Sequence, residues 1–262
     1  MRSIKKGDIV SRNSYNNDIL FFVERIDVVD NRARVAVLKG ITIRIEADSP
    51  IEDLTIVPKR IGENELRNIN RAEDIERIDN RLSVKLGKIL HLDGDRRYSE
   101  KTERYYRKRN LNFVVKHVSE YRQPQIIRDL LRRYRPDIVV FTGHDGLIKS
   151  GKNYDDINNY RTSKYFVNAV KEARMWNPNI NELVIFAGAC QSYYEAIISA
   201  GANFASSPAR ILIDFVDPLI VADTVATSNQ NRLVTMNDLE RKIRNGRMAI
   251  SGIGATGKST VI

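Results

Sequence analysis

The first part of the chain alternates short apolar runs with turn-forming residues. Runs rich in β-branched and aromatic residues cover 7–10, 19–26, 32–38, 42–47 and 54–57. Between them lie the turn signals Asn16-Asn17-Asp18, Asp30-Asn31, Lys39-Gly40 and Asp48-Ser49-Pro50. Short runs at this spacing predict β-strands, and five of them predict a small β barrel over residues 1–57.

The pattern changes in residues 58–80, where charged residues dominate. Leu66, Ile69, Ala72, Ile75 and Ile78 recur at the spacing of one helix face. We therefore expect a connecting helix and a domain boundary over 58–80, followed by a second domain over 81–262.

From residue 81 onward, apolar runs alternate with amphipathic stretches. Predicted strands cover 83–92, 112–117, 137–141 and 182–187, and predicted helices cover 99–109, a stretch opening near Pro124, 162–176 and 192–200. This alternation predicts an α/β fold, with a mostly parallel sheet between two helical layers. Ligands bind such sheets at the carboxyl ends of the strands. That rule directs attention to 93–95, 143–146 and 188–192.

Composition limits the class of protein. Of the 262 residues, 42% are hydrophobic and 29% are charged, which is typical of a folded globular chain. No apolar run is long enough to cross a bilayer, and the basic start lacks the apolar stretch of a secretory signal. We therefore expect a protein of a reducing compartment that binds no membrane.

The net charge of +10 is concentrated in one region. Residues 96–135 contain 13 Lys and Arg against 4 Asp and Glu. Two solvated helix faces would give this pattern, and so would a surface for nucleic acid or an acidic partner. The charge alone says little about chemistry.

The few cysteine and histidine residues restrict the chemistry further. Cys190 is the single cysteine and the histidines are His91, His117 and His144, so we expect no internal disulfide, no metal site and no cofactor. His144 and Cys190 each follow a predicted buried strand. Two such strands side by side would bring an imidazole base to a thiol nucleophile. The alternative is a structural cysteine beside an unrelated loop histidine.

Glycines around this pair suggest how a substrate carbonyl could be held. Gly143, Gly146 and Gly188 allow the backbone to approach closely, and N–H groups of Gly143, Gly146 and Cys190 could form an oxyanion hole. A helix predicted to open at Ser192 would place its N-terminus near the Cys190 thiol and favour the thiolate.

Two other motifs compete with this interpretation. Residues 188–192 resemble the nucleophile elbow of class I amidotransferases, but in that chemistry the histidine follows the cysteine in the chain. Residues 252–259 match the P-loop pattern G-x-x-x-x-G-K-[ST]. A P-loop needs a following helix to receive phosphate, and only Thr260–Ile262 follow in this sequence. We expect neither motif to function.

The His144 and Cys190 segments resemble the caspase-like clan of cysteine peptidases. In that clan an apolar strand ends in His-Gly, and a second strand ends in Ala-Cys followed by a small residue. Here 46 residues separate His144 from Cys190, although Asp145 stands between His144 and Gly146, which leaves open which glycine serves the oxyanion. More narrowly, the chain resembles the YabG family of sporulation peptidases. The further segments that carry this resemblance are Gly7–Val10, Leu38–Ile41, Ala47–Pro50 and His91–Asp95.

The resemblance implies a fold and a function. It implies a caspase-like three-layer α/β/α domain after an SH3-like or KOW-like barrel, and a cysteine endopeptidase that cuts after arginine. Its implied protein substrates are spore-coat and germination proteins, with self-cleavage, in the mother-cell cytoplasm at the forming coat. A nucleic-acid or protein-binding module with an inactive α/β domain is the alternative, through the basic 96–135 region.

An arginine-specific enzyme needs a carboxylate for the arginine that precedes the cleaved bond, the P1 residue. In the clan, the loop after the first strand commonly carries the charge that reads P1. The resemblance therefore implies this role for Asp93 or Asp95. Asp214, Asp217 and Asp223 follow Cys190 and could equally line the pocket.

Overall fold

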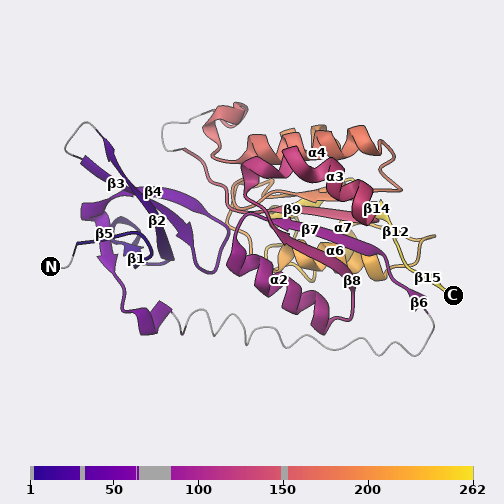
Figure 1. The fold of residues 1–262 in the computed structure, drawn as a ribbon, viewed down its shortest axis with the longest axis horizontal. Helices are drawn as coiled ribbons and strands as arrows, with labels where there is room; N and C mark the ends of the chain where they lie inside the picture. Colours follow the sequence, from indigo (N-terminus) through magenta and orange to yellow (C-terminus); the bar gives the residue numbers. More distant parts are fainter. Residues whose placement is uncertain (1–2, 30–32, 63, 65–83, 149–152, 262) are drawn as a thin grey trace. The chain divides into compact units, whose positions relative to one another are not determined.

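The structure is a computed structural model of the 262-residue chain (Figure 1). It describes all residues apart from 1–2, 30–32, 63, 65–83, 149–152 and 262. The chain forms two compact units, Met1–Asp74 and Ile75–Ile262. Most of the expected connecting helix over 58–80 lies outside the described residues. Within its described part, residues 59–62 are helical.

The N-terminal unit is a five-stranded antiparallel sheet with the order β4-β3-β2-β1-β5. Its core is formed by inward side chains such as Val10, Val23 and Leu38, which are almost fully buried. The strands are β1 (Ile9–Arg12), β2 (Leu20–Val29), β3 (Ala33–Gly40), β4 (Glu46–Pro50) and β5 (Leu54–Ile56).

The fourth strand corrects one prediction. Asp48-Ser49-Pro50 was expected to be a turn, but these residues pair with β3, with Ser49 opposite Ala36 and Pro50 opposite Val35. A proline is tolerated because β4 lies at the edge of the sheet, where no neighbour needs its missing N–H.

The C-terminal unit is built on a six-stranded sheet with the order β13-β11-β10-β9-β7-β8. Neighbouring strands are parallel, apart from β13, which is antiparallel to β11. The strands are β7 (Lys88–Asp93), β8 (Asn112–His117), β9 (Ile138–Thr142), β10 (Val184–Ala187), β11 (Phe204–Ser206) and β13 (Ile250–Gly252). The mostly parallel sheet predicted from the apolar runs is therefore confirmed.

Helices lie on both faces of this sheet (Figure 1), with α3 and α4 on one face and α2 and α6 on the other. The α3 and α4 face has a continuous apolar core that includes Ile127, Leu131, Phe166 and Val170. The helices are α2 (Arg96–Lys108), α3 (Gln123–Tyr134), α4 (Ser163–Trp176), α5 (Tyr194–Ser199), α6 (Asp217–Thr227), α7 (Met236–Leu239) and α8 (Gly246–Ala249).

Short strand pairs complete the unit. The predicted strand 83–92 is divided, because Gly87 interrupts it and its first part pairs with the C-terminal segment. The P-loop-like segment 252–259 forms strands and turns, and Lys258 Nζ donates to the carbonyl of Glu182 at 3.0 Å. These strands are β6 (Val84–Lys85), β12 (Leu233–Val234), β14 (Ala255–Thr256) and β15 (Thr260–Val261).

The strand order places a topological switch point between β7 and β9. After β7 the chain passes through α2 to β8 on one side, and then returns through α3 to β9 on the other side of β7. The helices that follow β7 and β9, α2 and α4, lie on opposite faces of the sheet (Figure 1), and ligands of such sheets commonly bind at this kind of switch point. Asp93–Asp95 and Gly143–Gly146 follow these two strands.

Candidate active site

The loop after β9 holds His144 in a fixed position. Its backbone N–H donates to Glu120 Oε1 at 2.8 Å, and its carbonyl accepts from Thr162 Oγ1 at 2.5 Å. His144 is fully buried, and its ring packs 5.5 Å from that of Tyr98 in α2. The backbone of His144 is therefore held by hydrogen bonds with Glu120 and Thr162, and its ring packs against Tyr98.

Two glycines make room for the Glu120 carboxylate. A Cβ atom on Gly94 or on Gly143 would stand only 2.2 Å from Glu120 Oε1. Both positions end a strand, one after β7 and one after β9. Their lack of a side chain lets a buried carboxylate enter between the two strand ends and bind the His144 backbone.

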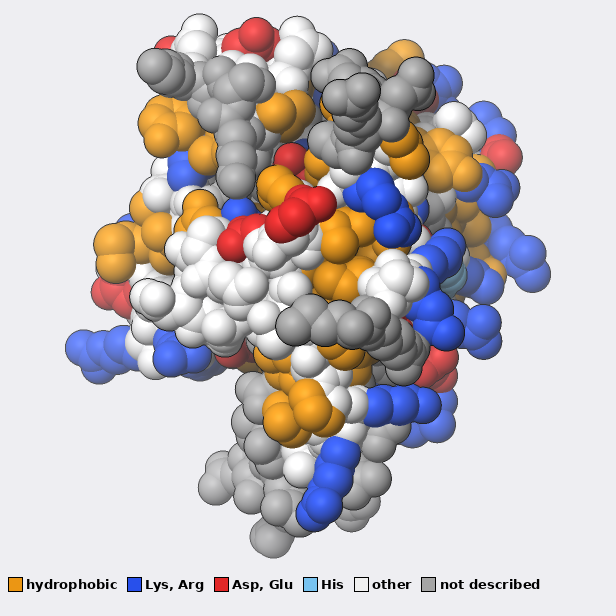
Figure 2. Space-filling view, turned by 90° about the vertical axis from the view of Figure 1, so that its left-hand side faces the viewer, with side chains coloured by type: hydrophobic (Ala, Val, Ile, Leu, Met, Phe, Trp, Pro, Cys, Tyr) orange, Lys and Arg blue, Asp and Glu red, His pale blue; other side chains and the backbone are white. Residues whose placement is uncertain are grey.

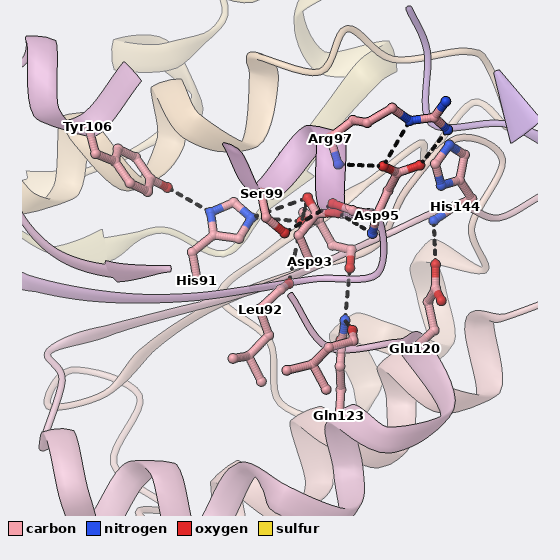
Figure 3. Close-up of polar contacts among 12 residues, drawn as sticks. His91, Leu92, Asp93, Asp95, Arg97, Ser99, Tyr106, Glu120, Gln123 and His144 are labelled. Carbon is pink, nitrogen blue, oxygen red and sulfur yellow. Dashed lines mark hydrogen bonds and ion pairs between the residues drawn. The ribbon is translucent and has the colours of Figure 1, made fainter. Parts of the chain in front are cut away.

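Asp95 is the charged group beside His144 (Figure 3). It caps α2 by accepting from Arg97 N at 2.8 Å, and Arg97 Nη2 lies 3.0 Å from its Oδ2. Burial alone would raise the pKa of Asp95, but the positive charge of His144 and the Arg97 contacts lower it well below its usual range. Since this attraction is mutual, the ionised carboxylate stabilises the protonated imidazole.

Asp93 lies deeper in the sheet edge. It is fully buried, and it accepts from Asp95 N and Thr142 Oγ1, each at 2.8 Å. Thr142 Oγ1 also lies 2.7 Å from His91 Nε2, and His91 Nδ1 lies 2.9 Å from the Tyr106 hydroxyl (Figure 3). This buried network joins β7, β9 and α2, and Asp93 belongs to it.

Cys190 follows β10 and is fully buried. Its Sγ accepts from Ile213 N at 3.3 Å, and the carbonyl of Ile213 lies 3.7 Å away. The expected helix contribution is corrected, because α5 has only six residues and begins at Tyr194 rather than Ser192. A backbone N–H of the 211–213 segment is the donor that the structure places on the sulfur.

The His144 and Cys190 loops are joined by direct hydrogen bonds. β9 and β10 are parallel neighbours with Phe141 opposite Ala187, so both loops leave the same edge of the sheet. Ser192 Oγ donates to Asp145 Oδ2 at 2.9 Å, and Leu147 N donates to Gln191 Oε1 at 3.2 Å. The structure therefore brings together the two predicted loops.

The glycines proposed for an oxyanion hole have different surroundings. The N–H of Gly146 donates to Asp145 Oδ1 at 2.9 Å, and that of Gly188 donates to the carbonyl of Phe141 at 3.0 Å. Gly188 has a φ of +117°, so it supplies a left-handed bend before Cys190. The N–H groups of Gly146 and Gly188 are therefore occupied in this structure, and the oxyanion hole of Gly143, Gly146 and Cys190 stays a prediction.

The three acids after Cys190 also differ. Asp223 pairs with Arg109, with 2.7 Å between Oδ2 and Nε. Asp217 Oδ2 accepts from Asp214 N at 3.0 Å. Asp214 is half-buried and directly follows Ile213, whose backbone contacts the thiol. Of these acids, Asp214 is the nearest in sequence to the backbone that contacts the Cys190 sulfur.

Asp217 gives a stability prediction. Burial, with repulsion from Asp214, raises the pKa of Asp217 to about 7 from 3.8. The folded state therefore binds more protons than the unfolded state between these values, and stability should fall as the pH rises through that window. Asp217→Asn should raise the free energy of unfolding by about 1–3 kcal/mol at pH 8, with a Tm gain of about 2–4 °C per kcal/mol.

Thermal unfolding at pH 8 and pH 4.5 checks this expectation. The gain should shrink at the lower pH, where Asp217 is protonated in the folded protein. Asp129→Asn is the matched control, because Asp129 is exposed on α3 of the same unit. An equal effect of Asp217→Asn at both pH values would contradict the assignment.

The basic 96–135 region is partly neutralised by acids. The face drawn in Figure 2 carries Lys and Arg side chains among hydrophobic and acidic ones. Several members of the region nevertheless pair with carboxylates, which favours solvated helix faces over a dedicated anion site. The paired residues are Arg96, Arg97, Arg107, Arg109, Arg128 and Arg132.

Metal-binding clusters and membrane-spanning helices are both absent from the described part of the chain. There, no group of three or more His, Cys, Asp or Glu side chains could hold a metal ion. In the same residues, no helix combines the length and the apolar character of a membrane span.

The mostly parallel sheet and the polar loops at its carboxyl edge are those of an α/β enzyme. The chain belongs to the YabG peptidase family, since residues 5–261 match the family described as YabG peptidase U57. It is 36% identical over 276 residues to the "Sporulation-specific protease YabG" of Bacillus subtilis (strain 168), a match that covers 96% of this chain and 94% of that protein. The resemblance to the YabG family found in the sequence is thereby confirmed, and the class of enzyme is peptidase.

Sequence reasoning missed two parts of this site. Glu120 lies on a short 3-10 turn (Glu120–Arg122), and nothing in its sequence surroundings distinguishes it from a surface acid. Ile213 contacts the thiol through its backbone, which no sequence pattern reports. Gly94 and Gly143 at two strand ends were the available signal for a close approach.

Proposed function

We propose that this peptidase is a cysteine endopeptidase with His144 and Cys190 as its catalytic pair. The observation that carries the proposal is the joining of their two loops at the carboxyl edge of neighbouring parallel strands. Covalent catalysis needs a base and a nucleophile held near one another, and the joined loops of two neighbouring strands support this assignment.

The proposed reaction uses these groups in sequence. His144 takes the proton of the Cys190 thiol, and the thiolate attacks the peptide carbonyl to form an S–C bond. The C–N bond then breaks as the imidazolium gives its proton to the leaving amine. Water, deprotonated by His144, then attacks the thioester carbonyl, the C–S bond breaks to release the acid, and the imidazolium returns its proton to the Cys190 sulfur. Asp95 stabilises the imidazolium during both halves, and backbone N–H groups of Gly143 and Cys190 hold the oxyanion.

The proposal includes a preference for arginine at P1. Asp93 is enclosed by its own network, and Asp95 is held by Arg97 and His144. Asp214 is half-exposed, and no ion pair joins it to a Lys or Arg among the described residues. These contacts favour Asp214 as the acid that pairs with the guanidinium, ahead of Asp93 and Asp95.

Two finer fold assignments belong to the same proposal. The strand order β8-β7-β9-β10-β11, with His144 after β9 and Cys190 after β10, supports a caspase-like domain. In the N-terminal unit, β5 returns to pair with β1, which supports an SH3-like barrel. We propose domains over 1–57 and 81–262 with the connection over 58–80.

The biological role follows from the family. The Bacillus subtilis relative is named a sporulation-specific protease. We propose that this chain acts in the mother cell of a sporulating bacterium, on spore-coat and germination proteins, and that it cleaves itself. No cofactor is needed for this chemistry.

An affinity label tests the proposal. The full chain should hydrolyse a peptide with arginine at P1, and a peptidyl-arginine chloromethyl ketone should stop the reaction. Mass spectrometry should find one adduct per chain, on Cys190. A chain that hydrolyses the peptide after full reaction with the label, or that is blocked only by a chelator or a serine reagent, would contradict it.

A further inference from the structure

The carboxylate of Asp145 is the most enclosed charged group between the two loops. It is fully buried, and each oxygen accepts two hydrogen bonds. Oδ1 accepts from the N–H groups of Gly146 and Thr162, both at 2.9 Å. Oδ2 accepts from Ser163 Oγ at 2.5 Å and from Ser192 Oγ at 2.9 Å.

The two hydroxyls that donate to Asp145 Oδ2 also accept hydrogen bonds from the segment that carries Cys190. Ser192 Oγ accepts from Ala189 N at 2.9 Å, and Ser163 Oγ accepts from Tyr193 N at 2.8 Å. The carboxylate is thus connected to the backbone on either side of Cys190. Asp145 itself directly follows His144 in the chain.

The Asp145 carboxylate is surrounded by four neutral donors, and its burial has an energetic cost that these hydrogen bonds offset. Burial raises the pKa of Asp145, while the hydrogen bonds from Ser163, Thr162, Gly146 and Ser192 oppose that shift. A carboxylate accepts from four donors without donating, whereas an amide in its place must present donors to at least two of them. With the amide oxygen facing the Gly146 and Thr162 N–H groups, the amide NH2 would face the Ser163 and Ser192 hydroxyls, which would then accept from it and turn their own O–H donors elsewhere.

We propose that Asp145 is a positioning residue that sets the Cys190 loop relative to His144. It reaches the reacting atoms through Ser192 and Ser163 and does not contact the substrate itself. This inference rests on the proposed His144 and Cys190 pair. It also assigns a role to the residue that separates His144 from Gly146.

The test is a kinetic comparison of single variants of the full chain. Asp145→Asn keeps the shape of the side chain but misdirects two hydrogen bonds. Because a displacement of about 1 Å can cost about 100-fold in rate, kcat should fall by about 30- to 300-fold. KM should change by less than about 3-fold, because substrate binding is not touched. Ser192→Ala should also lower kcat, and Asp145→Asn combined with Ser192→Ala should lose little more than Asp145→Asn alone.

Asp156→Asn is the matched control. Its carboxylate also accepts from a backbone N–H, that of Asn158 at 2.9 Å, in the same β9–α4 connection. Its hydrogen bonds with Asn158 stay within that connection, so kcat and KM should stay at the values of the unmodified chain. If Asp145→Asn does not fold, Ser192→Ala, which removes one oxygen atom, still supplies the kcat measurement.

The failure of this inference can be distinguished from that of the proposed pair. If Cys190→Ala hydrolyses the peptide normally, the pair is wrong whatever Asp145 does. If Cys190→Ala is inactive while Asp145→Asn and Ser192→Ala match Asp156→Asn, the positioning role alone is overturned. The positioning role would also be overturned if Asp145→Asn raised KM by the same factor by which it lowered kcat. Additive losses of kcat in the combined Asp145→Asn and Ser192→Ala variant would overturn it as well.

Discussion

Cys190→Ala should abolish peptide hydrolysis, with kcat/KM lowered by more than about 10⁴-fold, because no other group can form the thioester. His144→Gln should be similarly inactive, since the thiol then has no base. Glutamine is chosen because His144 is fully buried, and a smaller side chain would leave a cavity. Hydrolysis of a P1-arginine peptide by the purified variants measures the loss.

Folding and specificity controls accompany this measurement. Cys190→Ala should change the free energy of unfolding by no more than about 1–2 kcal/mol, since one sulfur atom is removed. His117→Gln is the matched histidine control, because His117 is exposed on β8. It should retain full activity. Normal turnover by folded Cys190→Ala would refute the cysteine mechanism.

Asp214→Asn should remove the preference for arginine. Loss of one partner of a desolvated charge pair costs about 2–5 kcal/mol, so kcat/KM on an arginine peptide should fall by roughly 30- to several-thousand-fold. A matched norleucine peptide should be hydrolysed as before, because its side chain carries no charge. Lysine should be a poorer substrate than arginine in the unmodified enzyme, since an ammonium cannot use both carboxylate oxygens equally well.

Asp95→Asn distinguishes the two candidate acids. We expect it to slow hydrolysis of the arginine, lysine and norleucine peptides alike, because Asp95 acts on the His144 charge. The opposite outcome is equally informative. If Asp95→Asn loses arginine selectivity while Asp214→Asn keeps it, the P1 acid lies in the loop after β7.

The strands of the central sheet could be predicted from the sequence more accurately than the elements and contacts around them. The predicted strand 112–117 matches β8, and the runs before His144 and Cys190 match β9 and β10 within two residues at each end. These strands are buried and rich in β-branched residues, so their signal is local. The positions of His144 and Cys190 at one sheet edge followed from the same signal.

The remaining elements depend on contacts that local patterns do not encode. Helix α6 is buried almost all round, so it lacks the polar face that makes a helix period visible. We predicted neither α6 nor the three-residue strand β11. Glu120 was missed for a related reason, because its value to the site lies in a bond to His144, 24 residues away.

The contact between Ile213 and the Cys190 sulfur has a consequence for how reactivity is measured. The thiol is fully buried and contacts that backbone, so under the proposed cysteine mechanism a substrate carbonyl should reach it only in molecules in which part of its surroundings has moved aside. The rate seen with any reagent is then the rate of the opened molecule multiplied by the fraction that is open. An intrinsically reactive thiolate can therefore look sluggish to a small alkylating agent. A peptide that binds the opened form raises that fraction itself, and so gives the truer measure of the nucleophile.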